Sequence, residues 1–248
     1  MQRRWRPENT VRGELRVAAF ARSLAYVVVV VVCALSAPTG AAGGAPADTV
    51  SFTVVALGDT QYYTSFFRDL FFEMTWWVSE CAAPDALNTA FVTHLGDIVH
   101  RGNRFHGDWQ AAAYGFKMIA VAGVPHGFLP GNHDKDNTRP DGDRFYEYRA
   151  AFPLHRYDRY AWFGGSFGGR DTRNTYQLWE VGMHRFVSLH LKHHPGSDVL
   201  RWASSVLRTH ADRTATVSTH YAGTDCSDEQ LGASPLANVS TLPAIDPV

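Results

Sequence analysis

The sequence is poor in cysteine and in net charge, and no internal repeat is visible in it. Its 248 residues include three cysteines and carry a formal net charge of −1. So little net charge excludes broad attraction to nucleic acid or to an anionic membrane, so any anion must bind at a local site. The length suits one α/β domain with its own core, and we expect a single globular domain.

The N-terminal region has no apolar run that would span a bilayer comfortably. The apolar run at residues 24–35 includes six consecutive valines, and six arginines precede it. A basic segment before a short apolar run is typical of a signal peptide. We therefore expect residues 1–36 to be a signal peptide, residues 37–48 to be an Ala/Gly/Pro-rich linker, and the protein to be secreted or extracytoplasmic. An uncleaved signal anchor is the alternative, and only then would the chain be tied to a membrane.

Export would also set the state of the remaining cysteines. Loss of the leader would leave Cys81 and Cys226. Two cysteines can pair in an oxidising compartment, but their spacing alone does not decide whether they do. Asn238 begins an acceptor sequence for N-glycosylation, which is consistent with export and with a glycoprotein.

Apolar periodicity predicts strands that alternate with helices in a domain at residues 49–248. Strands are predicted at residues 50–57, 90–95, 126–129, 176–181, 186–191 and 215–218, and helices at residues 66–81, 109–120, 145–151 and 199–207. We expect the aromatic stripe of the first helix to pack in the core. The alternation indicates an α/β protein with βαβ units and a largely parallel sheet.

Polar side chains follow four of these predicted strands, at the point where each strand ends. They are Asp59 and Gln61, then Asp97, then Asn132, His133 and Asp134, and last His220. In an open α/β sheet, ligands bind at this edge because the loops converge there. A glycine precedes Asp59, Asp97 and Asn132, and glycine lets the backbone turn sharply and approach an ion closely. Carboxylate, amide and imidazole ligands suit Mn, Fe or Zn.

The ordered series resembles the calcineurin-like metallophosphoesterases, whose motifs read Asp-x-His, Gly-Asp, Gly-Asn-His-Asp/Glu, His and Gly-His-x-His. The most specific match is Gly131-Asn132-His133-Asp134, and Asp59-Thr60-Gln61 is similar to a branch whose first motif reads Asp-Thr-Gln. The likeness covers residues 52–220. It implies a four-layer α/β/β/α sandwich with mixed sheets. It also implies hydrolysis of phosphate esters by a hydroxide that bridges two metal ions.

The resemblance also implies a ligand set for two divalent ions. Asp97 would bridge them, Asp59 and Gln61 would bind the first, and Asn132 and His220 would bind the second. Gln61 stands where histidine is commoner in the family. Because an amide oxygen is a harder and weaker ligand than imidazole, we expect the first site to favour Mn²⁺ or Mg²⁺ over Zn²⁺. The substrate would be a phosphate ester, with monoesters, diesters and diphosphates all open.

Further roles are implied for the residues around these ligands. His133 would be catalytic, either by stabilising charge on the phosphoryl group or by protonating the leaving oxygen. Asp134 could orient His133 or cap the next loop, and we favour the second. We expect His94 to be an interior histidine with its hydrogen bonds satisfied. The histidines at positions 190, 193 and 194 could line the mouth of the crevice or lie in a surface turn, and we expect the turn.

One motif of the family is missing, because no Gly-His-x-His follows His220 within these 248 residues. Each ion would then have three protein ligands and would bind more weakly. Two interpretations follow from the resemblance: a C-terminally truncated phosphoesterase whose sandwich is incomplete, or a catalytically inactive binding protein of the same fold. A sugar-binding α/β protein would account for the aromatic residues but leaves the ordered metal-ligand series unexplained.

Overall fold

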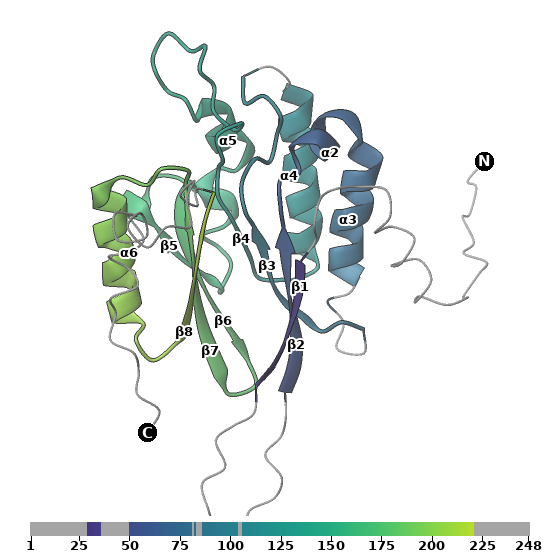
Figure 1. Cartoon of the computed structure of the whole chain (residues 1–248), viewed down its shortest axis with the longest axis vertical. Helices are drawn as coiled ribbons and strands as arrows, with labels where there is room; N and C mark the ends of the chain where they lie inside the picture. The colour runs from purple at the N-terminus through teal and green to yellow at the C-terminus, as the bar shows by residue number, and fades with distance from the viewer. Residues whose placement is uncertain (1–28, 36–49, 81, 83–85, 104–105, 221–248) are drawn as a thin grey trace, which may run out of the picture.

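The structure is a computed structural model that describes residues 29–35, 50–80, 82, 86–103 and 106–220 (Figure 1). It contains two four-stranded sheets. The first sheet has the spatial order β1 (Val29–Leu35), β2 (Val50–Leu57), β3 (Thr89–His94) and β4 (His126–Phe128). The second has the order β5 (Phe163–Ser166), β6 (Asn174–Val181), β7 (His184–Leu191) and β8 (Thr214–Thr219).

Strands β2, β3 and β4 form the parallel centre of the first sheet. The crossover from β2 to β3 contains α2 (Gln61–Phe66) and α3 (Arg68–Glu80), and the crossover from β3 to β4 is α4 (His106–Val121). Parallel neighbours need such helical crossovers, so the carboxyl ends of these three strands lie at one edge. This edge carries the loops on which the sequence places the candidate site.

Three apolar clusters show how the layers are stacked. One lies between α3, α4 and the first sheet and includes Val55, Val92 and Phe116. The second lies between the two sheets, where the rings of Trp179 and Phe186 stack with centroids 4.0 Å apart. The third joins β7 to α6 (Ser197–Thr209). The layers therefore run helix, sheet, sheet, helix, with α3 and α4 on one outer face and α6 on the other (Figure 1).

The predicted α/β class and the mixed sheets are confirmed. The expectation of a largely parallel sheet holds only for β2 to β4, because β1 is antiparallel to β2. In the second sheet, β5, β6 and β7 are antiparallel neighbours and β8 is parallel to β7. The predicted helix at residues 145–151 is α5 (Tyr146–Ala151), and short 3₁₀ turns follow at Leu154–Arg156 and Phe167–Gly169.

The aromatic stripe predicted for residues 66–81 divides between two helices. Phe71 and Val78 are fully buried on α3, as expected. Phe66 and Phe67 are 62% and 53% exposed, so the prediction that they lie in the core is wrong. The cause is a break at Phe67, whose φ of −134° and ψ of 54° end α2 and change the direction of the chain.

The second half of the apolar run that predicts a leader, Val29–Leu35, is strand β1 at the edge of the first sheet. This pairing does not test removal of a leader, so the signal peptide stays a prediction. No helix in the described ranges is both long and apolar enough to cross a membrane. The predicted linker, Cys81, Cys226, Asn238 and the predicted C-terminal incompleteness lie outside the described residues.

Two buried histidines, His190 between the sheets and His126 against Phe116 of α4, make stability depend on pH. Burial lowers the pKa of His190 to about 3 and that of His126 to about 4. His190 contacts Gln177 Oε1 at 2.8 Å and Thr93 Oγ1 at 2.9 Å, whereas His126 Nε2 has no hydrogen-bond partner among the described residues. Neither ring therefore has an anionic neighbour in these contacts that would favour its protonated form.

We expect acid to destabilise the fold between pH ~6.5 and ~4. In this window the unfolded chain binds more protons than the folded one, because both histidines have lowered folded pKa values. The contribution of these two histidines to the free energy of unfolding is therefore fully present above pH ~6.5. It is lost as the pH falls, by up to about 1.4 kcal/mol per pH unit for each histidine. Urea unfolding at a series of pH values measures this slope. The His190→Gln variant should show a shallower slope, and a slope equal to that of the wild type would contradict the assignment.

Candidate metal centre

The residues of the candidate site lie on four loops at the carboxyl ends of strands. Asp59 follows β2, Asp97 follows β3, Asn132 follows β4, and His220 follows β8. Strand β8 belongs to the second sheet, so the site joins the two sheets across their shared edge. The sequence predicts this convergence, because every one of these residues comes within four positions after a strand.

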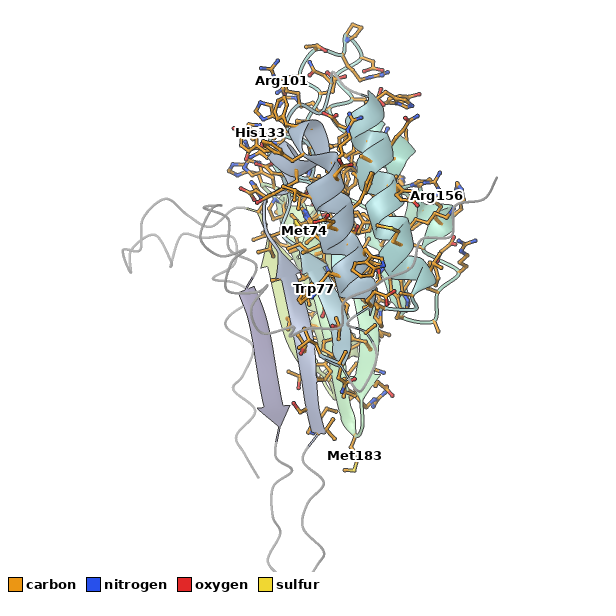
Figure 2. The ribbon with its side chains drawn as sticks, turned by 90° about the vertical axis from the view of Figure 1, so that its right-hand side faces the viewer. Met74, Trp77, Arg101, His133, Arg156 and Met183 are labelled. Carbon is orange, nitrogen blue, oxygen red and sulfur yellow. The ribbon has the colours of Figure 1, made fainter. Side chains whose placement is uncertain are left out.

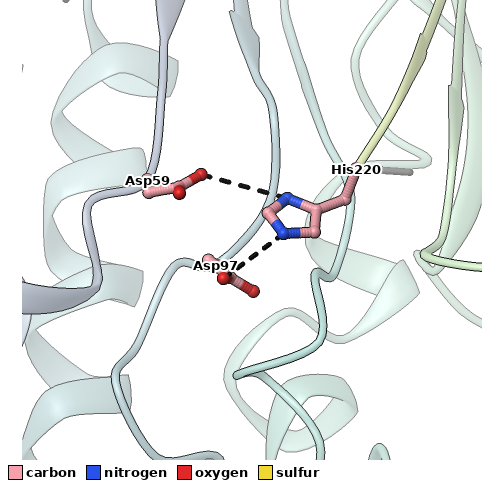
Figure 3. A group of neighbouring side chains, drawn as sticks. All are labelled: Asp59, Asp97 and His220. Carbon is pink, nitrogen blue, oxygen red and sulfur yellow. Dashed lines mark ion pairs between the residues drawn. The ribbon is translucent and has the colours of Figure 1, made fainter. Parts of the chain in front are cut away.

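Three of these side chains meet closely enough to share a cation. One ligand atom from each of Asp59, Asp97 and His220 lies within 4.8 Å of the others. His220 Nε2 is 3.3 Å from Asp97 Oδ2, and His220 Nδ1 is 3.9 Å from Asp59 Oδ1. Figure 3 shows the imidazole between the two carboxylates. Two carboxylates and one imidazole are a donor set that divalent metals bind.

The orientation of His220 tests whether this donor set fits a metal. Its Nδ1 lies 2.8 Å from the carbonyl oxygen of Leu95, which can only accept, so Nδ1 carries a proton and donates it. In the neutral ring, Nε2 then presents a lone pair toward Asp97 Oδ2 and toward Asn132 Oδ1 at 3.1 Å. Three electron-rich atoms that converge in this way require a cation or a proton among them. The fixed tautomer is also the one that metal-binding histidines adopt when the other nitrogen donates to a carbonyl.

The charges of the three side chains depend on one another. Burial raises the pKa of Asp59, and the negative charge of Asp97 raises it further. Burial disfavours the charged form of Asp97 too, but the hydrogen bonds from His220 and from the His133 amide outweigh it and lower its pKa. Burial opposes protonation of His220, but Asp97 outweighs it and raises the pKa of His220 to about 9. A cation placed here would relieve the repulsion between the two carboxylates.

Glycines let the loops approach the carboxylate of Asp97. Gly96 has a φ of 98°, and a Cβ built there would lie 2.7 Å from His220 Nδ1. A Cβ on Gly131 would lie 2.0 Å from Asp97 Oδ1. Asp97 itself has a φ of 50°, a left-handed conformation that is uncommon for residues other than glycine. The glycines of the Gly-Asp and Gly-Asn-His-Asp motifs are therefore required by close packing around one carboxylate.

We expect the Gly131→Ala variant to lose stability and the geometry of the centre together. The added methyl group would overlap the Asp97 side chain and backbone, so the loop after β4 must move. Such overpacking costs about 1–3 kcal/mol. The midpoint of chemical unfolding measures the loss, and Gly196→Ala is the matched control because nothing lies within 4 Å of its Cβ position. Equal midpoints for the two variants would contradict this account of Gly131.

Buried hydrogen bonds hold the loops of the site together. The Asp134 carboxylate accepts from the amides of Ile98, Val99 and Gly131, at 3.1, 2.9 and 2.8 Å. It therefore caps two loops, the one after β3 and the one after β4 in which Asp134 itself lies. The prediction that it caps the loop that follows it in the sequence is wrong. His94 is fully buried and satisfied, as predicted, with Nε2 2.9 Å from Thr60 Oγ1. Burial lowers the pKa of His94 to about 3, so its ring is neutral.

Two predicted site residues lie beside the three-residue group rather than within it. Gln61 begins α2, is buried, and has its Oε1 3.3 Å from His100 Nδ1. His133 donates its backbone N–H to Asp97 Oδ1 at 2.8 Å. Its ring Nδ1 donates to the carbonyl oxygen of His100 at 2.9 Å, and its ring stacks on the His100 ring with centroids 5.4 Å apart. His133 is thus joined to the centre through its backbone and oriented by its ring.

Two of the three histidines near the end of β7 match the prediction of a surface turn, because His193 and His194 lie in a bend after the strand. His190 is fully buried inside the strand, so for this residue the prediction is wrong. The ring of His193 faces that of His220 at 5.8 Å, and Lys135 Nζ donates to His193 Nδ1 at 2.9 Å. Sequence reasoning missed Lys135 as a neighbour of the site, although its place directly after Asp134 is a signal that could have found it.

The fold and this group of donor atoms define an α/β protein with a candidate metal centre at the ends of its strands. The sequence pattern of the calcineurin-like phosphoesterases matches residues 52–231, and the chain belongs to this family of phosphoesterase hydrolases. The family predicted from the motifs is thereby confirmed. Membership in the Asp-Thr-Gln branch and truncation stay predictions.

Individual relatives add a sequence match and two structural ones. The uncharacterized protein YvnB of Bacillus subtilis (strain 168) is 28% identical over 169 residues, which are 68% of this chain and 12% of that protein. The chain therefore matches a small part of that relative. The protein TT1561 of Thermus thermophilus has a TM-score of 0.43 at 14% identity over 75% of both chains. A dimetal phosphatase from Danio rerio has the same TM-score and identity over 68% of this chain and 69% of its own.

Proposed function

We propose that this chain hydrolyses phosphate esters with divalent metal ions bound at the edge shared by the two sheets. The observation that carries the proposal is the convergence of His220 Nε2, Asp97 Oδ2 and Asn132 Oδ1 around a point that a divalent cation can occupy in place of a proton, with Asp59 beside it. Membership in the phosphoesterase family makes a phosphate ester the substrate class.

The residues present fit a pair of ions. We propose that Asp59 and Gln61 hold one ion, that Asn132 and His220 hold the other, and that Asp97 lies between them. Asp97 supports this arrangement because it contacts His220 and lies in one group with Asp59. Mn, Fe, Zn or Mg are compatible with these oxygen and nitrogen donors, and Gln61 favours Mn²⁺ or Mg²⁺ over Zn²⁺.

Bound divalent cations supply Lewis-acid chemistry: they lower the pKa of water and stabilise charge on a phosphoryl group. The protein supplies position and protons. His133 has its Nδ1 proton held by the His100 carbonyl, so only the doubly protonated ring can donate to a phosphoryl or leaving oxygen, and it would do so through Nε2. Asp134 keeps the loops after β3 and β4 in a fixed relation, and this holds Asp97 and Asn132 in place.

The proposal is tested by metal removal and replacement. Protein stripped with a chelator is reloaded separately with Mn²⁺, Mg²⁺, Zn²⁺ and Fe²⁺, and phosphate release is measured with monoester, diester and diphosphate substrates. We expect no activity in the stripped protein and recovery with Mn²⁺ or Mg²⁺. A folded, metal-loaded protein that hydrolyses none of these substrates would overturn the proposal and leave the catalytically inactive binding protein. A clear preference for Zn²⁺ would contradict only the expectation based on Gln61.

We also infer that the protein is exported, because a basic segment and a short apolar run precede the domain. N-terminal sequencing of protein recovered from the extracytoplasmic fraction tests this inference. We expect a mature N-terminus after residue 36 or residue 42. An intact N-terminus in the membrane fraction would support the signal anchor instead.

A further inference from the structure

A pocket of ≈ 300 Å³ opens beside the candidate metal centre. Asn132 and His133 line the side of the pocket that adjoins the centre, and Arg101 and Lys135 also line it. Figure 2 shows Arg101 and His133 at the same end of the molecule. Asp59, Asp97 and His220 are not among the lining residues, so the pocket extends from the centre without being part of it.

The side chains that line this pocket suit an anion. Besides the cations of Arg101 and Lys135, they are amides and imidazoles, and the described lining includes no carboxylate. Asn103 and Asn137 supply the amides that lie away from the centre, and each amide can donate two hydrogen bonds. Guanidinium and ammonium groups with amide donors are the chemistry that binds phosphate.

Neither cation of this pocket is neutralised by a carboxylate. Among the described residues, no Asp or Glu oxygen lies within 4 Å of the charged groups of Arg101 or Lys135, whose ammonium donates to the neutral acceptor His193 Nδ1. Several other arginines are paired with aspartates: Arg139 with Asp141, Arg149 with Asp143, and Arg173 with Asp171. The two cations of the pocket are therefore free to attract an anion.

Lys135 lies near other cations. Burial lowers the pKa of Lys135, the charges of Arg144 and Lys192 lower it further, and the charge of Asp97 opposes them without outweighing them. Lys135 is therefore a cation that faces other cations, and an anion bound beside it would relieve their repulsion.

We propose that this pocket binds a second phosphate group of the substrate, next to the phosphoryl group that reacts at the metal centre. The inference rests on the proposed function and names its substrate class: phosphate esters that carry another phosphate close to the scissile one. An uncharged alkyl or sugar group would leave Arg101 and Lys135 without an anionic partner. A phosphate can accept charge-assisted hydrogen bonds from both.

Two substrates that differ by one phosphate test this subsite. We compare kcat/KM for propane-1,3-diol monophosphate and propane-1,3-diol bisphosphate with the full chain loaded with Mn²⁺. We expect the wild-type protein to prefer the bisphosphate by about tenfold or more. Arg101→Gln and Lys135→Gln should each reduce this preference several-fold with little change toward the monophosphate. Lys117→Gln on α4 removes an exposed lysine elsewhere and should leave the preference unchanged.

The remaining outcomes separate this inference from the proposed function. If both variants lose the same factor toward both substrates, the cations hold the reacting phosphoryl group and the subsite is overturned, while the phosphoesterase function stands. If the wild type shows no preference, the subsite is overturned as well. If neither substrate is hydrolysed, calorimetric binding of the two compounds decides the subsite independently. Tighter binding of the bisphosphate that depends on Arg101 and Lys135 would support it, and equal binding would overturn it.

Discussion

The Asp97→Asn variant is expected to lose metal-dependent phosphoesterase activity by at least about 100-fold, which corresponds to ~2.7 kcal/mol of transition-state stabilisation. Asp97 is almost fully buried, accepts the His133 amide at 2.8 Å, and lies 3.3 Å from His220 Nε2. The substitution removes the negative charge at the point where the loops meet. Because Asp97 would bind both ions, its replacement should lower the activity by more than the roughly 10–100-fold decrease typical of residues that only support a metal ligand.

Asparagine is the informative replacement because it separates charge from backbone strain. Asp97 has a φ of 50°, and asparagine, like aspartate, is among the residues other than glycine that adopt this left-handed conformation most often. The variant should therefore stay folded and still accept the His133 amide through its carbonyl oxygen. Asp69→Asn, an exposed carboxylate on α3, is the matched control and should keep full activity. Calorimetric Mn²⁺ binding equal to that of the wild type would contradict a ligand role for Asp97.

The sequence predicts the location of the site because neighbouring parallel strands have their carboxyl ends at the same edge of a sheet. Once residues 50–57, 90–95 and 126–129 are recognised as strands joined by helices, their carboxyl ends must share one edge. The short polar loops after them can then reach only one region. The strand pattern therefore predicts that Asp59, Asp97 and Asn132 lie together. His220 follows a strand of the second sheet, so its position beside Asp59 and Asp97 depends on how the two sheets pack.

Sequence reasoning could not supply contacts that depend on the second sheet. The contact of Thr93 with His190 and the contact between Lys135 and His193 join residues 97 and 58 positions apart. No local pattern encodes such pairs, because they depend on how the sheets pack. Phe66 and Phe67 fit the helical period of the core stripe and are nevertheless exposed, since a break in the backbone decided their position.

A second large effect is expected for His133, whose replacement by Gln should slow hydrolysis of an alkyl phosphate by about 10²–10⁴-fold. Its Nδ1 donates to the carbonyl oxygen of His100, so the doubly protonated ring is the form that can act as an acid, and Nε2 is the atom that gives the proton to the leaving oxygen. An alkoxide is a strong base and needs that proton, whereas p-nitrophenolate leaves readily without one. We therefore expect a loss of less than about tenfold with p-nitrophenyl phosphate.

Comparison of the two substrates distinguishes proton donation from mere positioning. Glutamine can place an N–H near the position of Nε2 but cannot act as an acid, so hydrogen bonding is retained and proton transfer is lost. His155→Gln, at an exposed position on the 3₁₀ turn at Leu154–Arg156, is the control and should leave both rates unchanged. An equal loss with both substrates would mean that His133 stabilises charge on the phosphoryl group instead. The stacking of its ring on His100 would then serve to hold a donor, and protonation of the leaving group would have to come from water.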